Sequence, residues 1–420
     1  MNLFGVEALT LGRSLSIARA MSSQASDSQS AKPAPTLSDR VDFAAGDVIE
    51  AVVEDLSRGG SGVIRSEGRV VFVPKTAPGD RVRVRVLSIQ KRWAEGELLE
   101  VLEPSALRIQ PRCPVFGRCG GCQWQHLPYE YQWKTKLSGA RHALDRVGLH
   151  PANPVWLEFP AKTVWEYRNR IQLRGEGQEL GFFEPGTRSR VPIERCDIAR
   201  PEINQRLPEV KVQGSKRDGE YKVEVEVLPS GQVRDMWNLR HAAGGFRQVH
   251  DEQNEVLQNA VRELLFGSGV QDSKAVRLWD LYGGAGNLSR PVMNFFRSVD
   301  CVDTGSPSAK PEGFCETFKF HRSPVLPWLK RQKLDSESGP LWVILDPPRA
   351  GLDSDGGEIV NLLARHRVQK IVAVGCDADS WARDLSRFSR NGWSLETAGA
   401  LDLFPQTPHV ESLALLVRKS

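Results

Sequence analysis

The sequence predicts a chain of three parts, in which β structure comes first and an α/β domain comes last. Short β-type runs between glycine and proline turns fill residues 41–105, a pattern typical of a small closed barrel of the OB type. Further strand-like runs and a cysteine-rich segment fill residues 106–250. From 251 to 420, short apolar runs alternate with helical patterns. This alternation indicates a Rossmann-like domain with a parallel, doubly wound sheet.

The composition sets limits on the environment of the chain. Lys and Arg number 56 against 52 Asp and Glu, a net charge of +4, which is compatible with an anionic partner without requiring one. Seven cysteines in 420 residues do not suggest a secreted disulfide scaffold. No run of about 18 apolar residues is present, so we expect no membrane span. Residues 1–40 lack a secretory h-region, and we expect a disordered tail on a cytoplasmic protein.

In the barrel region, residues 81–86 alternate strictly between arginine and valine. The alternation predicts a strand with Arg81, Arg83 and Arg85 on one face and the valines on the other. Strands are also expected at 48–53 and 70–74. Aligned arginines suit contact with RNA phosphates, although an ordinary solvated strand face would have the same sequence.

Three cysteines, Cys113, Cys119 and Cys122, lie in a glycine-rich segment that cannot form a regular element. Cys196 is the best candidate for a fourth ligand. The spacing suits either a [4Fe–4S] cluster or structural zinc.

Periodicity predicts the remaining elements. A helix is expected at 129–148, since its apolar residues recur at steps of three and four. The central strands are expected at 167–173, 179–183 and 221–227. The α/β domain is expected to have strands at 275–281, 298–303, 341–346, 370–375 and 412–417, and helices at 288–296, 358–366 and 380–388.

Two motifs follow strands of the α/β domain. The glycine-rich turn at 280–288 contains Gly284, and glycines there let the backbone approach a ligand at the carboxyl edge of the sheet. Asp303 ends the next strand, where an acidic residue commonly binds the ribose of an adenosine ligand. S-adenosylmethionine and NAD both fit this pattern. Asp346 opens an Asp-Pro-Pro-Arg-Ala-Gly motif, whose prolines make a rigid turn at the same edge.

Cys376 directly follows the strand at 370–375. A lone cysteine at a strand end is usually a small buried hydrophobe, but this one shares its sheet edge with the two motifs. A thiolate suits attack at carbon 6 of a uracil ring, which makes carbon 5 nucleophilic toward a sulfonium methyl group. Glu411, just before the last strand, is placed to remove the carbon-5 proton.

Together these motifs resemble the RNA uracil-C5 methyltransferase family that carries a TRAM domain and an iron–sulfur cluster. The resemblance covers nearly all of residues 45–420 and includes Phe-Arg-Gln-Val at 246–249 and Phe-Pro-x-Thr-x-His-Val-Glu at 404–411. It implies a class I S-adenosylmethionine-dependent methyltransferase domain, with Cys376 as nucleophile and Glu411 as base. It also implies that four further residues line the S-adenosylmethionine and uracil pocket: Gln248, Tyr282, Asp303 and Asp346.

The sequence departs from the family pattern at four places. Asp377 and His250 stand where the family usually has asparagine, and Gly283 stands where it has cysteine. The stretch 304–321 does not show the usual helix after the ribose-binding acid. We therefore expect an active enzyme with altered details at the cofactor.

Among possible functions, methylation of a uridine in 23S rRNA is the leading one, because barrel plus cluster is more typical of the rRNA branch. The same chemistry on a tRNA T-loop uridine is the runner-up. A silent RNA-binding assembly factor, or a flavin- or NAD-dependent enzyme, would leave Cys376 and Glu411 unexplained. We expect a monomer that binds RNA and no membrane.

Overall fold

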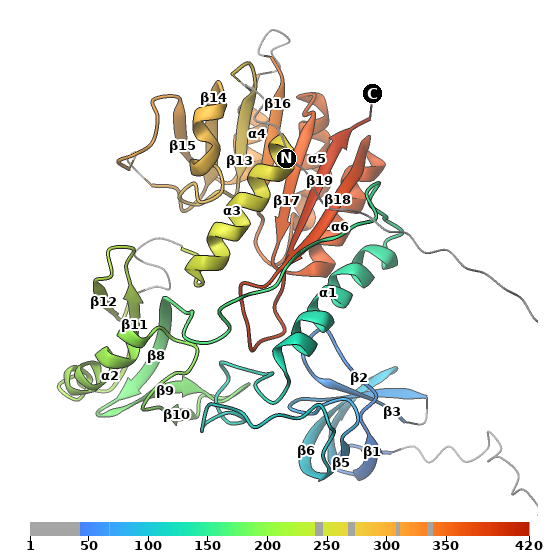
Figure 1. Cartoon of the computed structure of the whole chain (residues 1–420), viewed down its shortest axis with the longest axis vertical. Coiled ribbons are helices and arrows are strands. Elements are labelled where there is room, and N and C mark those ends of the chain that lie inside the picture. The colour runs from blue at the N-terminus through green and yellow to red at the C-terminus, as the bar shows by residue number, and fades with distance from the viewer. Residues whose placement is uncertain are drawn as a thin grey trace, which may run out of the picture. The chain divides into compact units, whose positions relative to one another are not determined.

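The computed structural model describes residues 43–66, 68–239, 247–267, 274–307, 311–333 and 339–419. The tail expected at 1–40 and Phe246 of the family motif lie outside these residues. Figure 1 follows the chain from the first strands in blue to the last in red. In the described ranges, no helix is long and apolar enough to cross a membrane.

The N-terminal barrel is confirmed. Its sheet has the order β1-β5-β6-β4-β3-β2. The two strands at the ends of this order, β1 and β2, are consecutive in the chain. The segment that contains both therefore connects the two edges of the sheet and closes the barrel. Apolar side chains such as Val71, Val82 and Val84 fill the interior. The strands are β1 (Val48–Val52), β2 (Asp55–Leu56), β3 (Gly62–Ser66), β4 (Arg69–Val73), β5 (Arg81–Ile89) and β6 (Trp93–Glu103).

The central β region is an antiparallel sheet with the order β10-β9-β8-β11-β12. One helix that the sequence did not lead us to expect, α2 (Pro201–Gly214), packs Ile203, Leu207 and Val210 against it. Pro208 lies inside this helix, and a proline at that position interrupts the sequence pattern expected of a helix. The strands are β8 (Arg170–Glu176), β9 (Glu179–Phe183), β10 (Arg190–Pro192), β11 (Glu220–Val227) and β12 (Val233–Trp237).

The C-terminal sheet has eight strands in the order β15-β14-β13-β16-β17-β19-β18-β7. The expectation of an all-parallel sheet is wrong, because β19 runs antiparallel to both neighbours. Strands β18 and β19 follow each other without a crossover helix, so as neighbours they must pair antiparallel. The strands are β7 (Leu157–Phe159), β13 (Arg277–Leu281), β14 (Ser298–Asp303), β15 (Phe318–Arg322), β16 (Leu341–Leu345), β17 (Lys370–Gly375), β18 (Trp393–Leu401) and β19 (Glu411–Arg418).

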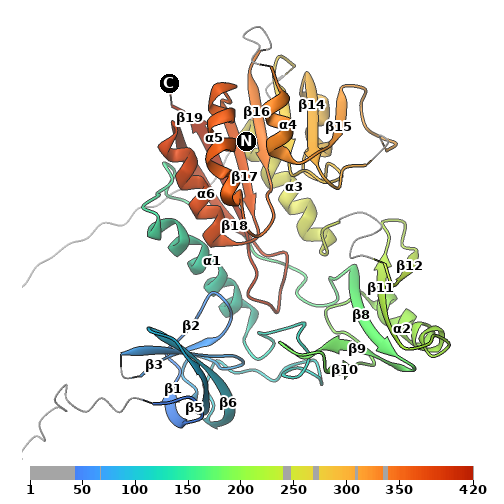
Figure 2. The same cartoon turned by 180° about the vertical axis from the view of Figure 1, so that it is seen from behind.

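Helices cover both faces of this sheet, as a doubly wound fold requires. Helix α3 packs on one face, as Figure 1 shows, and helices α4, α5 and α6 cover the other, which faces the viewer in Figure 2. Helix α1 also packs on that second face, beside α6. The helices are α1 (Tyr129–Arg146), α3 (Asp251–Phe266), α4 (Val325–Arg331), α5 (Gly356–Arg365) and α6 (Ala378–Arg390).

Two details bear on the functional site. The helix expected at 288–296 is a short 3-10 helix, η1 (Arg290–Phe295), which has a proline in its first turn. A second 3-10 turn, η2 (Asp353–Asp355), precedes α5. Between Asp303 and β15, the described residues contain no helix, as expected from the sequence.

Candidate active site

The strand register places the two predicted catalytic residues opposite each other. Gly375 at the end of β17 pairs with Ser412 at the start of β19. Because the two strands are antiparallel, Cys376 and Glu411 each lie one residue beyond this last pair of the ladder. The thiol and the carboxyl group therefore lie on neighbouring chain segments at one edge of the sheet.

Three other predicted residues end strands at the same edge. Leu281 of β13 pairs with Val302 of β14 and Leu345 of β16. Tyr282 and Asp346 are the next residues after Leu281 and Leu345, and Asp303 is the last residue of β14. Backbone hydrogen bonds continue the ladder here: Tyr282 N donates to Val302 O at 2.9 Å and Asp346 N to Leu281 O at 3.2 Å. The sheet thus gathers the residues that the sequence motifs singled out.

Burial makes this edge unfavourable for negative charge. The Glu411 side chain is nearly inaccessible, at 3% exposure, and burial and the nearby Asp346 raise its carboxyl pKa well above the ordinary value. Burial, Asp280 and Asp303 raise the pKa of Asp346 to about 7. Burial, Glu411 and Asp346 raise the pKa of the half-buried Cys376 thiol to about 12, against a smaller opposing effect of Arg349. Burial and the neighbouring acidic groups therefore raise the pKa of all three groups above their ordinary values.

Arg349 and His409 were within the quoted motifs but had no predicted role. The Arg349 guanidinium lies 3.2 Å from His409 Nε2, and Ser380 Oγ donates to the Arg349 carbonyl at 2.8 Å. Burial and the arginine lower the His409 pKa to about 4. His409 is thus a neutral imidazole at physiological pH, and Arg349 is a cation near Glu411 and Cys376.

The glycine-rich turn leaves room for a ligand. A Cβ built on Gly284 would meet no atom within 4 Å, and its φ of +56° is one that other residues rarely adopt. Tyr282 also has a positive φ, +62°. Helix α3 supports the turn, since the amides of Asn254 and Asn287 exchange hydrogen bonds of 3.0 and 2.8 Å. Sequence reasoning did not identify this amide pair.

The structure accounts for three departures from the family pattern. Asp377 caps α6, because its side chain accepts from Ser380 N at 2.9 Å. His250 likewise caps α3 by accepting from Gln253 N. A Cβ at Gly283 would lie 2.5 Å from Asp280 Cγ and 2.7 Å from Cys301 Sγ, so these two side chains fill the space that a cysteine at 283 would need. Aspartate is a good N-cap residue, and none of these changes disturbs the sheet edge.

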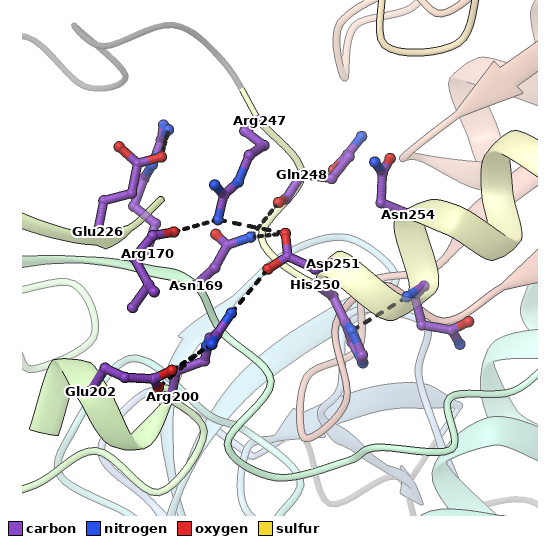
Figure 3. A network of polar contacts seen from close by, with 12 residues as sticks. Asn169, Arg170, Arg200, Glu202, Glu226, Arg247, Gln248, His250, Asp251 and Asn254 are labelled. Carbon is purple, nitrogen blue, oxygen red and sulfur yellow. Dashed lines mark hydrogen bonds and ion pairs between the residues drawn. The ribbon is translucent and has the colours of Figure 1, made fainter. Parts of the chain in front are cut away.

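Gln248 lies on the segment that leads into α3. It is buried, at 8% exposure, and its carbonyl accepts from Asn169 Nδ2 at 2.9 Å. Figure 3 shows that the same Asn169 amide reaches Asp251, which also contacts Arg200 and Arg247. The strand register that unites the other site residues does not include Gln248.

The four predicted ligand cysteines line a single pocket, together with Arg168 and other residues. Burial raises the thiol pKa of Cys122 to about 12 and that of Cys196 to about 11. Within the described part of the chain, however, no three His, Cys, Asp or Glu side chains are grouped so that they could hold a metal ion.

The three barrel arginines do lie on the outer side of β5, and each is paired with glutamate. Arg83 contacts Glu50 at 2.9 Å and Glu100 at 2.5 Å. Arg81 pairs with Glu103 and Glu50, and Arg85 with Glu97. All three side chains remain 40–49% exposed. The arginines are accessible, but glutamates already neutralise much of their charge.

Two family models match this chain. The TRAM domain model of tRNA (uracil(54)-C(5))-methyltransferase matches residues 49–107, and the tRNA (Uracil-5-)-methyltransferase model matches residues 328–419. The first match covers the barrel, and the second covers the segment that carries Asp346, Cys376 and Glu411.

Relatives match over most of their length. An uncharacterized RNA methyltransferase of Bdellovibrio bacteriovorus is 31% identical over 391 residues, covering 88% of this chain and 95% of that protein. Another from Nostoc sp. is 29% identical, covering 89% and 96%. The fold is similar to that of Pyrococcus abyssi tRNA (uracil-54, C5)-methyltransferase, solved with S-adenosyl-L-homocysteine, at TM-score 0.65, 23% identity and 88% and 99% coverage. This chain therefore belongs to the RNA uracil-C5 methyltransferase family and is an S-adenosylmethionine-dependent RNA methyltransferase.

Proposed function

We propose that this enzyme methylates carbon 5 of a uridine in 23S rRNA through a covalent adduct between Cys376 and carbon 6 of the base. The observation that carries the proposal is the strand register, in which Cys376 and Glu411 each lie one residue beyond the pair Gly375 and Ser412. A nucleophile and a base held across one antiparallel ladder can serve adjacent carbons of a single ring.

The residues act in a fixed order. Cys376 releases its proton to solvent and its sulfur forms a bond with carbon 6, while the carbon 5–carbon 6 π electrons move toward oxygen 4. S-adenosylmethionine, when bound, supplies a methyl group on a sulfonium sulfur. Carbon 5 bonds to that methyl group as the methyl–sulfur bond breaks. Glu411 then takes the carbon-5 proton, the double bond forms again, and the Cys376 sulfur leaves as thiolate.

The surroundings suit these roles. A buried carboxylate with a raised pKa is a stronger proton acceptor once it is ionised, which fits Glu411. Arg349 is the nearby cation that opposes the buildup of negative charge around Cys376. The open space at Gly284 and the adjoining Tyr282 and Asp303 would receive the adenosine part of the methyl donor. Gln248 and Asp346 complete the proposed pocket by family resemblance.

For the cysteine pocket we propose a [4Fe–4S] cluster held by Cys113, Cys119, Cys122 and Cys196. All four line the same pocket. Arg168, which also lines it, has a buried Nε that finds no hydrogen-bond partner among the described residues. A cluster with four thiolates is anionic and would provide a hydrogen-bond acceptor for the Arg168 Nε–H group.

A uridine of the tRNA T-loop is the second candidate substrate. It is favoured by the fold similarity to the Pyrococcus abyssi tRNA enzyme, which spans 88% of this chain and so includes more than the catalytic domain. The 23S rRNA assignment is supported by the family resemblance of the barrel combined with the cysteine segment. Mapping of 5-methyluridine in rRNA and tRNA from a deletion strain separates the two.

The adduct is tested with RNA that carries 5-fluorouridine at the target, because fluorine cannot be removed as a proton. Wild-type enzyme and Cys315→Ser, a control for general loss of a thiol, should form a denaturation-resistant complex with this RNA. Cys376→Ala should form none. On ordinary uridine, Glu411→Gln should accumulate a methylated complex that wild type releases. Equal trapping by Cys376→Ala would overturn the assignment of the nucleophile.

A further inference from the structure

The loop that carries Glu411 into the active site is tied down at one residue. This loop, residues 402–410, joins β18 to β19. Gln406 at its centre is 2% exposed and has a φ of +69°. A non-glycine residue in this left-handed region costs on the order of 1 kcal/mol or more and persists only where surrounding contacts impose it.

Gln406 uses nearly all of its hydrogen-bonding groups. Its backbone N–H donates to Gln132 Oε1 at 3.0 Å, and its side-chain Oε1 accepts from Gln132 Nε2 at 3.0 Å. Its carbonyl accepts from the backbone N–H groups of Gln123 and Trp124 at 3.0 and 3.1 Å. Gln132 itself is fully buried on α1. Helix α1 and the segment at Gln123 and Trp124, both remote from Gln406 in sequence, therefore hold this residue of the catalytic loop.

Neighbouring contacts leave the loop little room to move. The Trp124 indole N–H donates to Gly60 O at 3.0 Å, and a Cβ at Gly60 would lie 3.1 Å from Pro408. The Tyr167 hydroxyl donates to Pro405 O at 3.0 Å. Lys136 on α1 donates to Phe404 O at 3.0 Å. The loop is thus enclosed by the barrel, the cysteine-bearing segment and α1.

From these contacts we infer that Gln132 is a positioning residue for the catalytic base, and that the segment after Cys122 shares this task. Gln132 does not act on the substrate. It fixes Gln406, and the loop from Gln406 fixes the direction from which Glu411 reaches carbon 5. The inference rests on the proposed role of Glu411. Because Gln123 directly follows Cys122, the cysteine pocket and the catalytic loop share one hydrogen-bonded joint.

The test compares Gln132→Leu with Thr135→Val, a matched control one turn along α1 whose hydroxyl bonds to Tyr131 O within the same helix. Gln132→Leu should trap 5-fluorouridine RNA at a rate close to wild type. It should release ordinary methylated RNA about tenfold more slowly, a size expected when buried hydrogen-bond partners are left unpaired. Hydrogen exchange of residues 402–410 should be faster in Gln132→Leu and in Cys122→Ser, and unchanged in Thr135→Val.

Two results would overturn the inference. One is release and exchange in Gln132→Leu at the wild-type rates. The other is an equal loss of adduct formation and release, which indicates a general structural role. Unchanged exchange in Cys122→Ser would remove the cysteine segment from the inference. Failure of the proposed function is distinguishable, because Glu411→Gln itself would then not accumulate the methylated adduct.

Discussion

Cys376 and Glu411 each lie one residue beyond Gly375 and Ser412, the last pair of the β17–β19 ladder. Each group that must act on the base therefore adjoins this hydrogen-bonded ladder, Cys376 after the end of β17 and Glu411 as the first residue of β19. Because the two groups are close, the charge of each affects the pKa of the other. The Glu411 carboxylate is a cause of the raised thiol pKa of Cys376.

This proximity predicts the pH dependence of the thiol. The pKa of Cys376 is raised to about 12 in part by Glu411. Removing that negative charge in Glu411→Gln should lower the thiol pKa and shift alkylation of Cys376 by iodoacetamide to lower pH. Mass spectrometry of the Cys376 peptide in free protein measures the shift, with the Cys315 peptide as internal control. A profile that stays in place or moves to higher pH contradicts the proximity.

Asp346 should lower stability at neutral pH. Its pKa is raised from 3.8 to about 7, so the contribution of this carboxyl group to stability is fully present below about pH 4 and is lost as the pH rises toward 7. Asp346→Asn should be more stable than wild type at pH 8, by a few kcal/mol at about 1.4 kcal/mol per pKa unit. At pH 4 the two should be nearly equal. Urea unfolding measures this.

The control for that comparison is Glu179→Gln, which changes an exposed carboxylate on β9 and should leave stability nearly unchanged at both pH values. If Asp346→Asn is no more stable than wild type at pH 8, the carboxyl group is not held at a raised pKa in the folded protein.

The buried ion pair between Lys136 and Asp402 should be essential for stability. The Nζ–Oδ1 distance is 2.7 Å and both side chains are inaccessible. Lys136→Met leaves Asp402 buried and unpaired, which typically costs about 3–5 kcal/mol. Adding Asp402→Asn should recover most of this loss, because the amide oxygen can still accept from Phe404 N. Urea unfolding is the measurement.

Lys134→Met on the same helix is the matched control, since Lys134 is exposed. A comparable loss of stability in this variant would attribute the effect to the helix and not to the ion pair. Failure of Asp402→Asn to restore stability would indicate that the buried charge is not the cause.

The barrel arginines should contribute to RNA affinity through phosphates. Replacing Arg81, Arg83 and Arg85 with glutamine should weaken binding and reduce the log–log salt slope, by up to about 0.9 for each phosphate that an arginine no longer neutralises. Because glutamates compete for these arginines, replacing Glu97 and Glu100 with glutamine should strengthen binding at low salt. An unchanged slope in the arginine variant would make this an ordinary solvated strand face.

The cysteine pocket should hold iron. Protein purified without oxygen should contain about four irons per chain and absorb broadly in the visible range, as [4Fe–4S] proteins do. Cys196→Ser should lose iron and colour, whereas Cys315→Ser should keep both, since Cys315 is not among the pocket residues. One zinc per chain with no iron would instead indicate a structural zinc site.

Local sequence pattern was sufficient for most strands and for the positions of the motifs. The strands at Glu179–Phe183, Ser298–Asp303 and Lys370–Gly375 have the expected bounds, because alternation and apolar runs are properties of neighbouring residues. The glycine turn, the Asp-Pro-Pro turn and the two catalytic candidates could be identified for the same reason. The two turns and Cys376 share a sheet edge because parallel strands of a doubly wound sheet end together, whereas Glu411, the first residue of β19, lies at that edge because β19 runs antiparallel.

Other features depend on residues that are distant in sequence. No local pattern shows that β19 inserts antiparallel between β17 and β18. Nor does one show that β7, which precedes the central sheet in the chain, joins the C-terminal sheet. The pairing of Arg83 with Glu50 and Glu100 likewise depends on neighbouring strands. These differences arise because strand order and charge pairing are decided by packing, which the local periodicity does not encode.

The sequence by itself thus determined the element types, the motifs and the chemistry of Cys376 and Glu411. Only the tertiary structure decided how Glu411 is held, because Gln132 and Gln406 are 274 residues apart. A buried amide pair over that separation has no signature in either segment. It forms because folding removes both amides from water, and buried amide groups need hydrogen-bond partners within the protein.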